Sequence, residues 1–78
     1  MSQEVISIRN RIVSLALSSS RRLRIANNDL ERSSLLAALS LLSIASSVVE
    51  TNPSDARLLH SQARQLSAIQ GQEDDGKN

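Results

Sequence analysis

The sequence predicts an all-α protein, in which an antiparallel helical hairpin and a third helix form one small interaction domain over residues 1–70. Residues 33–49 contain no charge, glycine or proline, and their apolar residues recur at the three- and four-residue spacing of a helix. The single proline of the chain directly follows an asparagine, an order typical of a helix start. Aromatic residues and cysteine are absent, so the core must consist of Leu, Ile, Val and Ala.

The first helix is predicted over residues 3–26, with Ser2 as its N-cap and Glu4 in the first turn, where the helix dipole favours negative charge. One apolar face comprises Val5, Ile8, Ile12, Leu15, Ala16, Ser19 and Leu23. A second apolar stripe, about 100° further round the helix, comprises Ile6, Val13 and Leu17. A single antiparallel neighbour covers only the first face, so we predict that the second stripe binds a partner.

The second helix is predicted over residues 29–51. Asn28 can cap it, and Glu31, three residues further on, completes a capping box. Neither glycine nor proline interrupts the chain at this point. A single kinked helix through the first two segments is therefore the alternative.

This second helix contains the uncharged stretch 33–49 and has two apolar stripes. The first comprises Leu35, Ala38, Leu42, Ala45 and Val49, and the second comprises Leu30, Ala37, Leu41, Ile44 and Val48. An apolar arc of this width predicts two helical neighbours. Leu36 and Leu39 lie towards the serine-rich side, where we predict further partner contacts. A membrane partner is not expected, because a span needs roughly 20 mostly apolar residues and this stretch contains six serines.

The third helix is predicted over residues 53–70. Asn52 supplies the cap and Pro53 occupies the first helical position, where a missing N–H costs nothing. Its apolar face comprises Ala56, Leu59, Ala63 and Leu66, with Leu58 and Ile69 beside them. Gly71 is a natural stop, and the acidic residues 71–78 are predicted to form a disordered tail.

The junction between the second and third helices resembles a known repeat. Asn52-Pro53-x-x-Ala56, followed by Ala63 and Leu66, is similar to the boundary between two tetratricopeptide repeats. The match covers about 15 residues of the 34-residue unit. The resemblance implies a helical hairpin that binds a peptide or another helix, and it assigns no site residues.

The sequence offers little for catalysis or metal binding. His60 is the only histidine and cysteine is absent, so no metal-ligand set of the usual spacing can be drawn, and no cofactor is expected. The serines lie mainly in helices, and no glycine-rich phosphate loop or nucleophile motif occurs, so we do not expect an enzyme. His60 lies on the third helix beside Arg57 and Arg64. This pattern predicts a solvated face, with a pH-sensitive or anion-contacting face as the alternative.

The predicted function is protein–protein interaction. We expect a cytoplasmic adaptor, chaperone subunit or anti-activator that packs apolar helix faces against another protein or its own copy. The alternative is a small DNA-binding regulator that uses the densest basic cluster, Arg21, Arg22 and Arg24. A nucleic-acid partner is not favoured, because the formal net charge is only +1 and no aromatic side chain is present to stack on bases.

Overall fold

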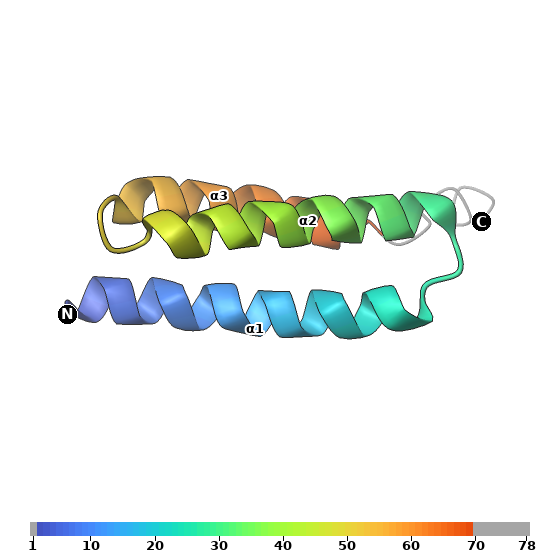
Figure 1. Ribbon diagram of the computed structural model, residues 1–78, viewed down its shortest axis with the longest axis horizontal. Coiled ribbons are helices and arrows are strands. Elements are labelled where there is room, and N and C mark those ends of the chain that lie inside the picture. Colours follow the sequence, from blue (N-terminus) through green and yellow to red (C-terminus); the bar gives the residue numbers. More distant parts are fainter. Residues whose placement is uncertain (1, 70–78) are drawn as a thin grey trace.

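The computed structural model describes residues 2–69, which form three α-helices. These are α1 (Gln3–Ile25), α2 (Asp29–Val48) and α3 (Pro53–Ser67). Consecutive helices run antiparallel, and α2 contacts both of its neighbours but packs most extensively on α3 (Figure 1). The predicted all-α arrangement of three antiparallel helices is confirmed. The tail predicted over residues 71–78 lies outside the described residues.

Each helix begins at a side chain that caps it. An N-cap oxygen accepts a hydrogen bond from a backbone N–H that otherwise lacks a helical partner, which stabilises the helix by about 1 kcal/mol. The bonds join Ser2 Oγ to the Val5 N–H (3.1 Å), Asn28 Oδ1 to the Glu31 N–H (3.0 Å) and Asn52 Oδ1 to the Asp55 N–H (3.1 Å). All three predicted caps are confirmed. Because a capped helix starts after Asn28, α1 and α2 are separate helices and not one kinked helix.

The second helix ends earlier than the sequence predicts, at Val48 and not at Thr51. The residues after it form a turn in which the Asn52 N–H, at 2.7 Å, and the Thr51 hydroxyl, at 3.3 Å, both donate to the Val48 carbonyl. Asn52 cannot stay helical, because it caps α3 and precedes a proline. The turn therefore takes the place of the last predicted helical residues.

The third helix also ends early, at Ser67 where residue 70 was expected, whereas α1 ends at Ile25, within one residue of its predicted end. Ala26 is already extended, which directs the chain into the connection to α2. At the end of α3, the Ala68 N–H donates to the carbonyls of Arg64 (3.1 Å) and Gln65 (3.3 Å). The bond to Gln65 spans only three residues, and bonds with this spacing tighten a last helical turn and satisfy its free carbonyls.

The core runs along the line where the three helices meet. Its buried hydrophobic residues are Val5, Ile8, Ile12, Leu35, Ala38, Leu42, Ala45, Val49, Ala56 and Ala63. The first apolar face of α1 and the first stripe of α2 therefore form the core, as the periodicity predicts. The buried residues that α3 contributes are small, which lets this helix approach α2 closely.

Two surface ion pairs join the start of α1 to the residues on either side of the turn between α2 and α3, which lies at the same end of the bundle (Figure 1). Glu4 pairs with Arg57, and Arg9 Nη2 lies 2.7 Å from Glu50 Oε2. Exposed pairs of this kind are worth at most about 1 kcal/mol each, so they orient α1 more than they stabilise it. Within residues 2–69, no helix combines the length and the apolar content needed to cross a bilayer.

Candidate functional site

A groove with apolar walls lies between α1 and α2, and we call it the apolar groove. It has a volume of about 450 Å³ and is lined by Ile12, Val13, Ala16, Leu17, Leu39, Leu42, Ser43, Ser46 and Ser47. Three of the five residues predicted to bind a partner, Val13, Leu17 and Leu39, therefore meet in one place although they come from two helices. These residues lie together because α1 packs antiparallel on α2.

The walls of the apolar groove are exposed while its floor is buried. Ile12 and Leu42 belong to the core, whereas Val13 is 50% exposed and Leu17 is 53% exposed. A large aliphatic side chain gains about 1.5–3 kcal/mol on full burial. Val13 and Leu17 are only half buried in the isolated chain, so a partner that covers the groove would bury them further and would be stabilised by that burial.

Three serines line the α2 side of the apolar groove together with Leu39 and Leu42. The Ser47 hydroxyl donates to the Ser43 carbonyl at 3.2 Å, one turn earlier on the same helix. A serine bonded in this way has its donor satisfied and does not need a partner for it. Because serine is also small, this side of the groove allows another helix to approach closely.

The other two predicted partner-binding residues lie outside the lining of this groove. Ile6 is 41% exposed on the same stripe of α1 as Val13, and Leu36 is 52% exposed about one turn before Leu39 on α2. They extend the apolar surface beyond the groove along each helix. Ala16 and the three serines were not predicted to line a groove. Their place in the lining depends on which sides of α1 and α2 face each other, and the sequence does not give this.

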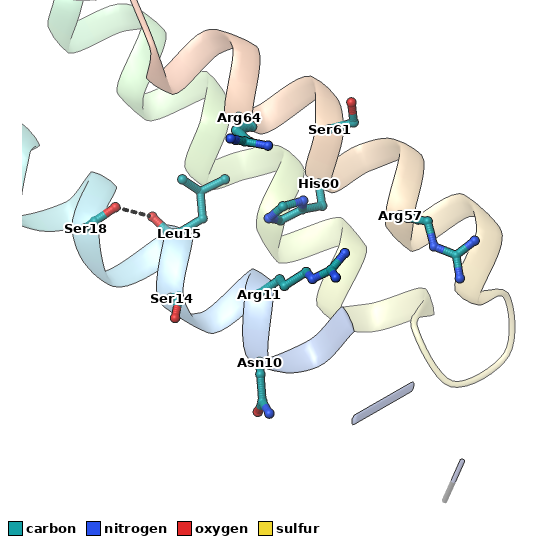
Figure 2. Close-up of a pocket in the computed structure, with 9 residues that line it drawn as sticks. All are labelled: Asn10, Arg11, Ser14, Leu15, Ser18, Arg57, His60, Ser61 and Arg64. Atoms are coloured by element: carbon teal, nitrogen blue, oxygen red, sulfur yellow. Dashed lines mark hydrogen bonds between the residues drawn. The ribbon is translucent and has the colours of Figure 1, made fainter. Parts of the chain in front are cut away.

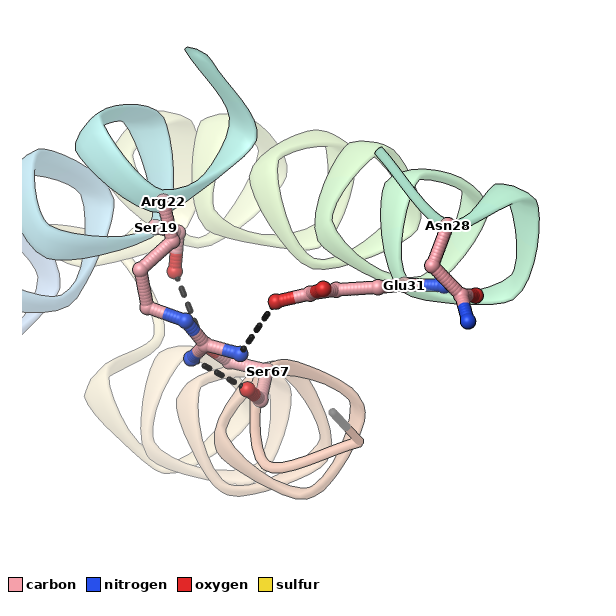
Figure 3. Close-up of polar contacts among 5 residues, drawn as sticks. All are labelled: Ser19, Arg22, Asn28, Glu31 and Ser67. Atoms are coloured by element: carbon pink, nitrogen blue, oxygen red, sulfur yellow. Dashed lines mark hydrogen bonds and ion pairs between the residues drawn. The ribbon is translucent and has the colours of Figure 1, made fainter. Parts of the chain in front are cut away.

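Arg22, one of the three arginines proposed as anion contacts, is bonded inside the fold (Figure 3). Its Nη1 donates to the Ser67 carbonyl and, at 3.2 Å, to Ser67 Oγ, which also shares a 3.0 Å hydrogen bond with the buried Ser19 hydroxyl. Its Nη2 lies 3.5 Å from the Glu31 carboxylate, close enough for an ion pair although it makes no hydrogen bond within the described chain. These four residues, which we call the polar clasp, join α1, α2 and α3.

The other two arginines of that cluster, Arg21 and Arg24, lie on the surface of α1. They are three residues apart, and α1 packs only its opposite face on the other helices. The structure therefore separates the predicted cluster into one arginine that ties the helices together and two that face solvent.

A second groove, which we call the cationic groove, lies between α1 and α3 (Figure 2). It has a volume of about 770 Å³ and is lined by Asn10, Arg11, Ser14, Leu15, Ser18, Arg57, His60, Ser61 and Arg64. Arg11 reaches from α1 towards His60 on α3, and Arg57 and Arg64 lie on either side of His60 along the helix. The sequence indicates the three α3 residues as neighbours, but it gives no sign that Arg11 joins them.

The environment of His60 reflects this concentration of positive charge. Burial, followed by the nearby guanidinium groups of Arg11 and Arg64, holds the pKa of His60 below its ordinary value of 6.5. A backbone hydrogen bond with Arg11 acts in the opposite direction and is the smallest of these effects. His60 is therefore mainly neutral at pH 7, and the charge of the groove comes from its arginines.

No known protein family, curated protein or solved structure matches this chain. The resemblance of the Asn52-Pro53 junction to a tetratricopeptide boundary therefore stays a prediction. In the part of the chain that the structure describes, no three histidine or acidic side chains gather as a metal site.

Proposed function

We propose that this chain is a small helical protein–protein interaction module whose apolar groove receives an amphipathic helix, either from a partner protein or from a second copy. The observation that carries the proposal is that Val13, Leu17 and Leu39 line one groove while Val13 and Leu17 stay half exposed. An adaptor, a chaperone subunit and an anti-activator are the roles that fit a module acting by binding and not by catalysis.

The size of the apolar surface supports a helix as the occupant. A stable interface buries roughly 800 Å² on each partner, which is more than the groove residues alone can supply. Ile6 and Leu36 extend the apolar surface along α1 and α2, so a helix lying lengthwise can contact them as well as the groove. A helix also presents apolar residues at the spacing needed to fill a groove between two other helices.

The DNA-binding alternative has less support. It needs Arg21, Arg22 and Arg24 to act together on phosphates, but Arg22 is bonded to Ser67 and paired with Glu31. The two remaining exposed arginines make too few phosphate contacts for strong binding to duplex DNA at physiological salt.

The proposal can be tested with Val13→Asp, matched to Leu58→Asp. Both residues are exposed aliphatics, at 50% and 59%, but Leu58 lies on α3 and outside the apolar groove. Val13→Asp places a charge in the groove that a covering helix would have to desolvate. We expect it to abolish self-association or partner co-purification and to leave far-UV circular dichroism unchanged, while Leu58→Asp retains association.

Sedimentation velocity and affinity co-purification of the three proteins measure this. Equal association of the Val13→Asp protein and the wild type would place the partner surface elsewhere. Loss of helicity in the Val13→Asp protein would show that Val13 belongs to the core and would also overturn the proposal.

A further inference from the structure

Two of the three arginines of the cationic groove have no carboxylate partner among the described residues. Of its three arginines, Arg57 pairs with Glu4, but neither Arg11 nor Arg64 forms an ion pair with a carboxylate of residues 2–69. No acidic residue lines the groove. Two guanidinium groups from different helices therefore face one space without a counter-charge from the described part of the chain.

The arrangement of these charges defines the shape of a matching ligand. Arg57, His60 and Arg64 follow one another at intervals of three and four residues on α3, so they span about 10 Å along the helix axis. Arg11 faces them from α1 (Figure 2). A single small anion can meet only one part of such a row, whereas an elongated ligand with several negative groups can meet all of it.

We propose that the cationic groove binds an acidic segment of a partner protein, with two or more carboxylates placed against Arg11 and Arg64. A guanidinium group donates two parallel hydrogen bonds to a carboxylate, a geometry that lysine cannot match. A nucleic acid fits less well, because the chain has no aromatic side chain and little net positive charge to attract a polyphosphate. The site is independent of the apolar groove, since it lies between a different pair of helices.

Binding to this groove also has a consequence for His60. Arg11 and Arg64 together with burial disfavour its protonated form, and bound carboxylates would offset the effect of the arginines. Arg57, the third cation facing His60, is already paired with Glu4. Acidic segments should therefore bind more tightly as pH falls towards 5.5, as long as their own carboxylates stay ionised.

The test uses the full-length chain and a fluorescein-labelled, alanine-based helical peptide with glutamates at positions i, i+3 and i+7. The same peptide with glutamine at those positions is its control. Arg11→Gln/Arg64→Gln is compared with Arg21→Gln/Arg24→Gln, which removes the same charge from exposed positions of α1 outside the groove. Fluorescence anisotropy gives the dissociation constants.

We expect the glutamate peptide to bind the wild type, and we expect Arg11→Gln/Arg64→Gln to weaken it about fivefold or more, as two lost ion pairs imply. The Arg21→Gln/Arg24→Gln protein should stay within about twofold of the wild type. Equal weakening by the two double variants, or equal binding of the glutamine peptide, would overturn the proposal in favour of unspecific attraction.

A further variant tests whether acidic residues of the same chain, Glu73, Asp74 and Asp75, occupy the groove in place of a partner. If only the Glu73→Gln/Asp74→Asn/Asp75→Asn protein binds the glutamate peptide, these residues occupy the groove and the partner proposal is wrong. If neither protein binds it, the groove does not recognise carboxylates and the proposal also fails.

Discussion

His60 lies between Arg11 and Arg64, and its protonation adds a further positive charge to the cationic groove. Its pKa in the folded protein is lowered, so between that value and the ordinary 6.5 the unfolded chain binds the proton more readily. Stability therefore rises with pH through this window and is lost as pH falls below about 6.5. We expect urea denaturation to give a lower free energy of unfolding at about pH 5.5 than at about pH 8.

The matched variant is His60→Gln, which keeps a polar side chain of similar length and removes the titration. Its free energy of unfolding should change much less between the same two pH values, because the substitution removes the single imidazole of the chain. If the two proteins lose stability to the same extent, another group is responsible and the environment assigned to His60 is incorrect.

The role of individual arginines follows from tertiary contacts that the sequence does not reveal. Arg22 looks like a member of a surface cluster because Arg21 and Arg24 flank it, yet it reaches Ser67, 45 residues further along the chain. Arg11 has no basic neighbour that points to its role, and it lies opposite His60 only because α1 packs beside α3. Helical periodicity places a residue on a face, but it does not say which helix that face meets.

At the scale of helices, the starts were predictable because their determinants are local. The Asn52 side chain accepts the Asp55 N–H at 3.1 Å and donates to Asp55 Oδ2 at 2.9 Å, so two bonds fix the start of α3 within four residues. The ends were less predictable, since the turn after Val48 depends on where α3 begins. Gly71 was expected to stop the third helix, but the helix ends four residues earlier, at Ser67.

Asn52→Ala should lower the free energy of unfolding by about 1 kcal/mol, because it removes the side chain that caps α3. The control is Asn27→Ala, the same substitution in the connection between α1 and α2. Asn27 is exposed and makes no side-chain hydrogen bond with any residue of the described chain, so its loss should change stability by less than about 0.5 kcal/mol. Chemical denaturation with urea measures both, and equal effects would mean that the Asn52 cap is not what stabilises the start of α3.

At the scale of the molecule, the sequence predicts which helix faces are apolar, but it does not predict which of these faces the other helices cover. The second stripe of α2 was expected to meet a helical neighbour, and Leu41 and Val48 do pack at the edge of the core. Leu30 and Ile44 on the same stripe stay about half exposed. With three helices there is not enough partner surface to cover every stripe, which is why a small helical chain is left with apolar grooves and faces.

The core and the exposed leucines of α2 allow a direct comparison within one helix. Leu42 is 2% exposed beneath the apolar groove, whereas Leu36 is 52% exposed. Leu42→Ala should lower the free energy of unfolding by about 2–5 kcal/mol, through lost burial and the cavity that remains. Small proteins have a total stability of only about 5–15 kcal/mol, so this single substitution should remove a large fraction of it.

Leu36→Ala is the control, since it makes the same change in helix propensity on the same helix. It should cost less than about 1 kcal/mol, because much of this side chain is already in water. Urea denaturation followed by circular dichroism gives both values, and sedimentation velocity shows whether either variant changes the assembly. A similar loss in the two variants at a concentration where the chain self-associates would mean that Leu36 is buried between copies. The same similarity in a monomer would contradict the core described here.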